Sequence, residues 1–151
     1  TSRIQNIRLM RKLLLLTLFS VTVISIIMSA CGDENSIKYQ RYYADGSQIY
    51  KVHCANCHMD DGKGLAALIP PLTDTIYLRK NRDKLACFIV YGLKDTIIVN
   101  NQEYQGIMPA EKHLPAIDLA KVLTYITNSY GNKQGIYDVT EVEANLKNCR
   151  D

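Results

Sequence analysis

Several features that would assign a chain to a common class are missing from this sequence. Its 151 residues contain no tryptophan, no internal repeat and no low-complexity tract, which allows one domain and a small surplus. A basic excess is also missing from most of the chain. The net charge is +3, but residues 1–30 hold four basic side chains and no acidic one, and the remainder has 14 basic against 15 acidic side chains, a net of −1. The charge therefore gives no reason to expect nucleic acid as a partner.

The N-terminal 30 residues have the pattern of a secretory signal segment. The basic pair Arg11-Lys12 precedes the apolar run Leu13–Ile27. We expect Met10, which lies just before this run, to be the true start of the protein. An uncleaved anchor helix is the alternative, although 15 apolar or hydroxyl-bearing residues are few for crossing about 30 Å of hydrocarbon.

A cysteine follows the signal segment directly. The run Met28-Ser29-Ala30-Cys31 resembles a bacterial lipobox, in which the cysteine is lipidated and becomes the first residue of the mature protein. Lipidation of Cys31 would anchor the protein to the periplasmic or cell-surface side of a membrane. Residues 31–44 are then expected to be a polar tether, residues 45–131 a folded domain, and residues 132–151 a helical tail.

The strongest motif in the chain is Cys54-Ala55-Asn56-Cys57-His58. Cysteines three positions apart lie on one side of a helical turn, so both thiols can reach the two vinyl groups of one porphyrin. The adjacent His58 can then supply a ligand to the iron. A structural zinc site needs four ligands, and no second Cys-x-x-Cys or neighbouring His pair exists. A thioredoxin-like dithiol needs a βαβ context that the flanking sequence does not offer. The motif predicts one covalently attached haem c.

A haem that only transfers electrons needs a second axial ligand, and Met108 is the best candidate. It lies 50 residues after His58, between a glycine and a proline in Gly106-Ile107-Met108-Pro109, which favours a fixed, tightly turned strap. Met59 and His53 adjoin the His58 side and are not expected to reach the opposite face. His113, close to the strap, is the remaining alternative.

Hydrophobic spacing predicts mainly helices. We expect a first helix over about 45–57 with a capping box at Asp45 and Gln48, and close helix packing at Gly46. Short helices are expected over 74–78 and 83–91, and a small hairpin over 96–104 with its turn at Asn100-Asn101. A longer helix should begin at Pro115 as its first residue and end at Gly131, and a terminal helix should begin with a capping box at Thr140 and Glu143.

Together these motifs resemble a class I cytochrome c domain over about residues 42–130. The shared features are Gly46 with Tyr50, Cys54 to His58, Gly62-Lys63-Gly64, Pro70-Pro71-Leu72, Gly106 to Pro109, and Val122 to Ile126. The run before Met108 is similar to small cytochrome domains attached to periplasmic dehydrogenases and copper reductases. The resemblance implies an all-α cytochrome c fold with a small β-hairpin before the Met strap. It also implies that the carbonyl of Pro70 fixes His58.

Two further expectations concern side chains around the haem and in the tail. An apolar wall should keep water from the haem, formed by Leu68, Leu72, Ile89, Ile98, Leu119 and Leu123. If Cys31 carries lipid and Cys54 and Cys57 carry haem, Cys87 and Cys149 remain. Because such a compartment is oxidising, we expect these two to form a disulfide, with two separately buried thiols as the alternative.

The sequence is therefore interpreted as a membrane-anchored, monomeric monohaem cytochrome that passes single electrons between redox proteins by transient contact. It is not expected to be an enzyme, because two side-chain ligands leave no place for a substrate at the iron. The alternatives are an accessory haem subunit of one dehydrogenase or of a nitrite or oxygen reductase, and a haem gas or redox sensor. Lysines at positions 51, 63 and 112 are expected to surround the haem edge and to steer an acidic partner.

Overall fold

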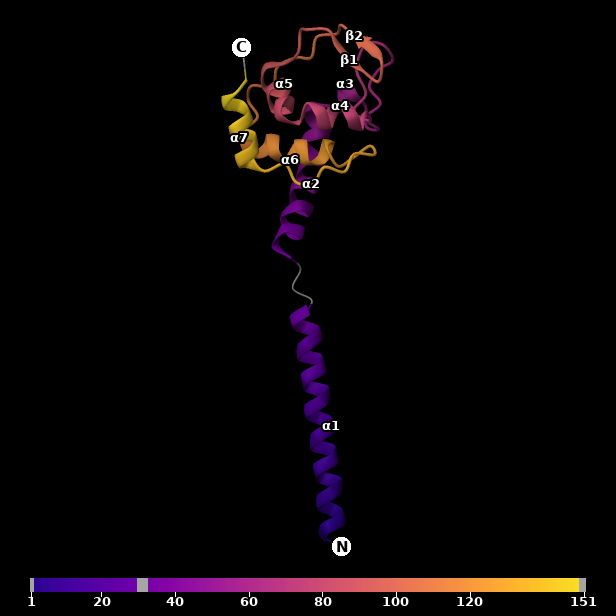
Figure 1. Cartoon of the computed structure of the whole chain (residues 1–151), viewed down its shortest axis with the longest axis vertical. Coiled ribbons are helices and arrows are strands. Elements are labelled where there is room, and N and C mark those ends of the chain that lie inside the picture. The colour runs from indigo at the N-terminus through magenta and orange to yellow at the C-terminus, as the bar shows by residue number, and fades with distance from the viewer. Residues whose placement is uncertain (1, 30–32, 150–151) are drawn as a thin grey trace. The chain divides into compact units, whose positions relative to one another are not determined.

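The structure, a computed structural model, describes residues 2–29 and 33–149 (Figure 1). These residues belong to two compact units, 1–37 and 38–151. The first unit consists mainly of helix α1 (Ser2–Ser29). Within the described ranges, no helix combines the length and the apolar character needed to cross a membrane. The expected lipidation site, Cys31, lies outside the described residues.

The second unit is all-α apart from one hairpin, as predicted. Its elements are α2 (Glu34–His53, which starts in the first unit), α3 (Ala55–His58), α4 (Thr75–Lys80), the 3₁₀ helix η1 (Arg82–Lys84), α5 (Leu85–Tyr91), β1 (Ile97–Val99), β2 (Gln102–Tyr104), α6 (Ala116–Ile126) and α7 (Val139–Lys147). Strands β1 and β2 are antiparallel, with Val99 opposite Gln102. Asn100 and Asn101 both have positive φ, as a tight primed turn requires, so the predicted hairpin is confirmed.

Helix α2 begins eleven residues earlier than expected, at Glu34. The predicted capping box at Asp45 is therefore wrong, because Asp45 lies within the helix and its carboxylate pairs with Lys121 at 3.1 Å. No glycine or proline interrupts residues 34–45, and Tyr42 is buried in the core. The helix continues through this part of the expected tether because its inner face has a core to pack against.

Helices α2 and α6 cross at Gly46 (Figure 1). A Cβ atom at this position would lie 2.0 Å from the carbonyl oxygen of Lys121 and 3.0 Å from Cβ of Tyr125. The missing side chain thus permits the close approach that the sequence predicted, and it brings the rings of Tyr50 and Tyr125 to a centroid distance of 5.3 Å. This contact fixes the end of α2 that leads into the Cys54–His58 motif.

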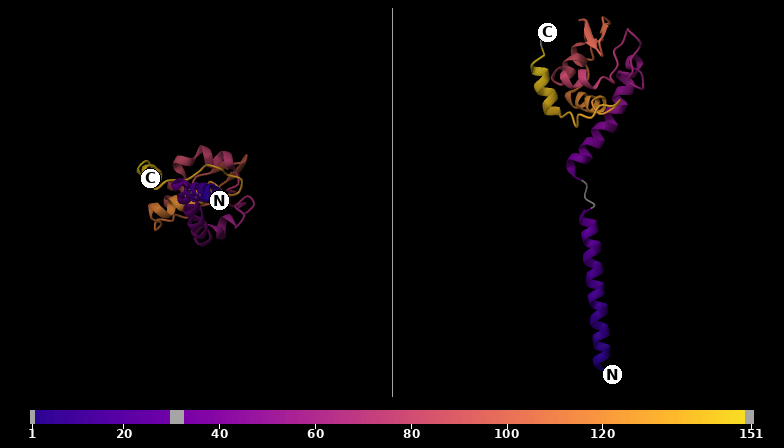
Figure 2. Two further views of the ribbon diagram at one scale, coloured as in Figure 1. Left: turned by 90° about the horizontal axis from the view of Figure 1, so that it is seen from below. Right: turned by 45° about the vertical axis from the view of Figure 1, so that its right-hand side comes forward.

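The boundaries of the last two helices differ from those expected. Helix α6 ends at Ile126, before Gly131, since the side-chain hydroxyl of Thr127 bonds back to Leu123 and the chain then turns. Helix α7 is capped by Asp138, whose carboxylate accepts from the backbone N–H of Thr140 at 3.2 Å, so the predicted box at Thr140 and Glu143 is wrong. Asp138 lies one residue before the helix and is the stronger cap. Helix α7 packs against α5 and α6 (Figure 2).

Candidate haem site

An apolar cavity lies between the Cys54–His58 motif, α4, α5, the hairpin and α6. The space between its lining residues amounts to about 670 Å³, which includes open solvent. Its lining residues are Cys54, His58, Pro70, Pro71, Leu72, Tyr77, Leu78, Leu85, Phe88, Ile89, Leu93, Ile97, Val99, Met108, Leu123 and Ile126. A second hollow shares His58 and Met108 with it and extends past Cys57, Leu68 and Ile107.

Three of the six expected wall residues, Leu72, Ile89 and Leu123, line this cavity. Leu119 is fully buried but belongs to the core beside the cavity. Leu68 is 65% exposed and lines only the second hollow, so the predicted apolar wall is wrong at this residue.

Ile98 was assigned to the wrong face of its strand. Its side chain is 66% exposed, whereas Ile97 and Val99 line the cavity. Side chains alternate between the two faces of a strand, so Ile97 and Val99 share one face and Ile98 takes the other. The run of four β-branched residues gave no polar alternation from which to choose the face.

The two cysteines of the motif stand at the edge of the cavity. Cys54 is the residue before α3 and is half-buried, Cys57 is exposed, and neither is in a disulfide. Burial raises the pKa of the Cys54 thiol to about 12, with smaller contributions from the Glu111 carboxylate and Cys57. Cys54 lines the main cavity and Cys57 lines the second hollow, and His58 and Met108 line both.

His58 is oriented by the backbone of the proline loop. Its Nδ1 lies 3.1 Å from the carbonyl oxygen of Pro70, the hydrogen bond that the resemblance implied. Burial lowers the pKa of His58, and the bond to Pro70 partly offsets this. A neutral ring that donates from Nδ1 has an unprotonated Nε2, the form in which imidazole binds a metal.

Met108 is held by a short stretch of antiparallel pairing. Its N–H donates to the carbonyl of Leu93 at 2.9 Å, and its own carbonyl accepts from the N–H of Leu93 at 3.0 Å. Gly92 has a φ of 76°, and a Cβ there would lie 2.4 Å from the Met108 oxygen. Farther along the strap, the N–H of Glu111 donates to the carbonyl of Ile89 at 2.8 Å. The strap is thus fixed at two points to α5 and the residues that follow it.

The other candidate ligands do not line the cavity. The carbonyl of Met59 accepts from the hydroxyl of Tyr50 at 2.6 Å, and the residue has a positive φ. His53 faces Glu111, with 3.4 Å between Nδ1 and Oε2, and His113 is exposed. In the described ranges, no group of three or more His, Cys, Asp or Glu residues could hold a metal ion. Met108 therefore shares the cavity with His58, and its three competitors do not.

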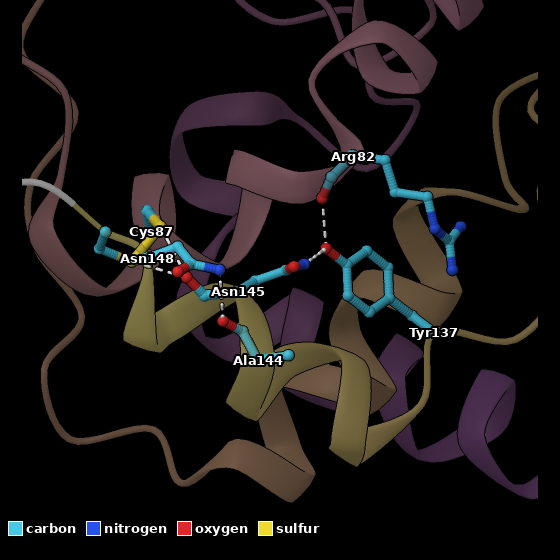
Figure 3. The surroundings of a disulfide bond; sticks show 7 residues. Arg82, Cys87, Tyr137, Ala144, Asn145 and Asn148 are labelled. Atoms are coloured by element: carbon cyan, nitrogen blue, oxygen red, sulfur yellow. Dashed lines mark hydrogen bonds between the residues drawn. A yellow bond between two sulfur atoms is a disulfide. The ribbon is translucent and has the colours of Figure 1, made fainter.

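Cys87 and Cys149 are joined in a disulfide, with 5.6 Å between their Cα atoms (Figure 3). The bond links α5 to the residues after α7, across 62 positions of sequence.

Sequence reasoning missed Asn132, which is only 2% exposed. Its side-chain amide donates to the carbonyl of Leu72 at 2.9 Å, although the two residues are far apart in the chain. An asparagine directly after a glycine has the pattern of an ordinary turn residue, so no sequence signal distinguished Asn132.

A half-buried imidazole whose second nitrogen is already hydrogen-bonded is what a protein offers to a haem iron, and this chain is a haem-binding electron-transfer domain. It belongs to the cytochrome c family: the family model named Cytochrome c matches residues 43–129, more than half of its length. Membership implies a covalently bound haem c, and the domain is of the class I, monohaem-like kind.

Three relatives illustrate the range of the similarity. Cytochrome c-552 of Thermus thermophilus is 31% identical over 97 residues, which make up 62% of this chain and 73% of that protein. The cytochrome c subunit of the quinone alcohol dehydrogenase of Gluconacetobacter polyoxogenes is 33% identical over 91 residues, 58% of this chain and 19% of the subunit. The cytochrome subunit of the fructose dehydrogenase of Gluconobacter japonicus is 28% identical over 107 residues, 66% of this chain and 21% of the subunit.

Proposed function

We propose that this chain is a monohaem cytochrome that carries single electrons between redox proteins outside the cytoplasm. Cys54 and Cys57 hold one haem c through thioether bonds, and His58 and Met108 ligate its iron. One observation carries the proposal: His58 and Met108 line the same apolar cavity, and backbone hydrogen bonds fix both segments.

The residues present fit a haem in three respects. The cavity lining is almost wholly apolar, as the macrocycle requires, and Leu72 and Pro70 contribute to it. The two thiols stand at its edge rather than in its depth. Burial lowers the pKa of the His58 imidazole that lines the cavity, which favours the neutral ring that a metal requires.

When bound, the haem supplies the exchange of one electron at iron. The chain's own residues orient the ligands and exclude water. The Pro70 carbonyl holds the Nδ1 proton of His58, which orients the ring and raises its basicity toward the metal. The apolar lining excludes water, and the paired strap holds the Met108 sulfur in place. Little in the protein then needs to move when the iron changes charge.

Ligation by two side chains supports a carrier rather than an enzyme, since it leaves no open position on the metal. A gas or redox sensor would need Met108 to leave the iron. The pairing of Met108 with Leu93 through both backbone groups opposes that movement.

An accessory haem subunit of a dehydrogenase is the second candidate. The similarity to cytochrome subunits of the quinone alcohol and fructose dehydrogenases favours it. Because this chain spans only about a fifth of those subunits, the likeness concerns one domain of them. Co-purification with a dehydrogenase from native membranes would support this candidate. A cytochrome that exchanges freely between redox partners would support a general carrier.

Electrons should enter and leave beside Cys57, where Leu68 and Ile107 are exposed. A small apolar surface suits a transient redox contact, in which fast release matters more than affinity. Exposed Lys51 and Lys112 are expected to steer an acidic partner. Lys63 should contribute less than the sequence suggested, because its ammonium pairs with Asp61 at 2.7 Å.

The anchor proposed for this carrier is lipid on Cys31, in keeping with the signal segment that precedes it. Mass spectrometry of the mature protein should find a diacylglycerol-modified cysteine at its N-terminus. Cys31→Ser should release the protein from membranes. If the wild type carries an unmodified Cys31 and washes off membranes at high salt, lipid anchoring is wrong.

The haem assignment is tested by mass spectrometry of the denatured protein, which should retain one haem. The double variant Cys54→Ala and Cys57→Ala should lose it, while the control Cys87→Ala, outside the motif, should keep it. Release of haem from the wild type on acid extraction would overturn the assignment.

A further inference from the structure

Residues 130–149, here called the tail, lie beyond the part of the chain that matches the family. They nevertheless contact the two segments to which the proposed iron ligands are hydrogen-bonded or attached, the loop that contains Pro70 and helix α5. One contact is made by Asn132 and the other by Cys149.

Asn132 holds the loop that orients His58. Its amide nitrogen donates to the carbonyl of Leu72 at 2.9 Å and to that of Ser129 at 2.9 Å, which ties the loop to the end of α6. Leu72 is two residues from Pro70, and the backbone of both Pro70 and Pro71 is stiff. A hydrogen bond at Leu72 therefore constrains the Pro70 carbonyl that accepts from His58.

Tyr130 supports the same side of the cavity. Its ring lies over Gly62, where a Cβ atom would come within 2.6 Å of it. The N–H of Leu72 donates to the Gly62 carbonyl at 2.7 Å, so this packing reaches the proline loop as well.

The other end of the tail holds α5. Cys149 is bonded to Cys87, and the neighbouring residues Phe88 and Ile89 line the cavity. The carbonyl of Ile89 accepts from Glu111, three residues after Met108. Movement of α5 would therefore move one of the two attachment points of the strap.

A buried network reinforces this contact. The hydroxyl of Tyr137, a fully buried residue, donates to the carbonyl of Arg82 and accepts from Asn145 at 2.7 Å (Figure 3). The Arg82 guanidinium donates to both carboxylate oxygens of Glu141, at 2.6 and 2.8 Å. Since Arg82 belongs to η1, directly before α5, the tail is attached to this segment at two places, at Arg82 and at Cys87.

We propose that the tail positions the two iron ligands from outside the haem cavity, with Asn132 acting on His58 and the Cys87–Cys149 disulfide acting on Met108. This inference rests on the proposed function. The two contacts should act on different properties of the haem, because each reaches a different ligand.

The test compares two tail variants of the full-length haem protein. In Cys87→Ser with Cys149→Ser, the strap should loosen: the far-red absorption band of methionine ligation should weaken. The apparent affinity of the ferrous protein for carbon monoxide should rise by on the order of tenfold, because it follows the fraction of molecules with Met108 detached. In Asn132→Leu the band should remain, and the midpoint potential should rise, since a less well-held His58 donates less charge to iron.

Two controls separate positioning from general stability. Val122→Ala removes methyl groups from a fully buried α6 residue that does not line the cavity, and Asn148→Leu removes an exposed amide whose bond stays within the C-terminal end of α7. Val122→Ala should lower stability but leave the band, affinity and potential unchanged, and Asn148→Leu should change none of them. If the tail variants behave like Val122→Ala, the tail only stabilises the fold and the proposal is wrong. A wild type without covalent haem or without the far-red band would instead overturn the proposed function.

Discussion

The crossing at Gly46 gives a prediction in which two opposing effects can be weighed. Alanine is favoured over glycine inside a helix by about 0.8–1 kcal/mol, so Gly46→Ala should stabilise α2 if propensity decides. The added Cβ, however, would lie 2.0 Å from the Lys121 oxygen, and ordinary contact begins at 3.4 Å. The helices would have to separate by about 1.4 Å, the difference between these values. A carbonyl within a helix cannot rotate aside as a flexible side chain can.

Overpacking of this kind costs about 1–3 kcal/mol, and a rigid backbone partner places Gly46→Ala at the upper end. After the gain in propensity, we expect the free energy of unfolding to fall by about 2 kcal/mol, measured by urea denaturation of the haem protein. The control is Ala44→Gly, at an exposed position of the same helix, which should lose about 1 kcal/mol through propensity alone. If Gly46→Ala is as stable as the wild type or more so, the helices do not cross as closely as described.

Three further predictions concern the ligand, the tail and the partner surface. Met108→His should lower the midpoint potential by on the order of 0.1–0.3 V, because axial ligands span roughly 0.8 V; an unchanged potential would mean that another residue ligates the iron. The hydrogen bonds from Lys38 and from the backbone N–H of Thr140 lower the pKa of Asp138 from its ordinary value of 3.8. The ionised carboxylate therefore stabilises the fold fully above pH 3.8, and this stabilisation is lost as the pH falls through the folded-state pKa. Asp138→Asn should therefore be less stable than the wild type in urea at pH 7, and the difference should shrink as the pH falls below 3.8. Lys112→Glu should slow reduction by an acidic partner in stopped-flow experiments at low salt; equal rates for both proteins at every ionic strength would exclude steering by this residue.

The haem motif and the strap could be predicted because their chemistry is local. Cys54 to His58 requires fixed spacing, and the glycine and proline around Met108 mark a turn whatever the rest of the fold does. Pairing of Cys87 with Cys149 could also be predicted, since assigning the other cysteines left these two.

Features that depend on packing could not be read from the sequence. The start of α2 depends on Tyr42 packing into the core, and the face taken by Ile98 depends on which side of a short strand faces the cavity. The role of Asn132 depends on a carbonyl 60 residues away in the chain. Each is decided by a partner distant in sequence, which local propensity does not specify.

The disulfide also changes what a protease can do to this protein. Cys87 and Cys149 close a covalent ring that contains the hairpin, Met108 and α6, while the Cys54–His58 motif lies on the chain leading into the ring. One backbone cut within the ring, for example at the exposed Asn100-Asn101 turn, therefore leaves the molecule in a single covalent piece with its cysteine motif and its methionine still joined. On a denaturing gel, the nicked protein would migrate as one band without a reductant and as two bands with one. Staining for haem would then mark the N-terminal fragment, which carries the Cys54–His58 motif.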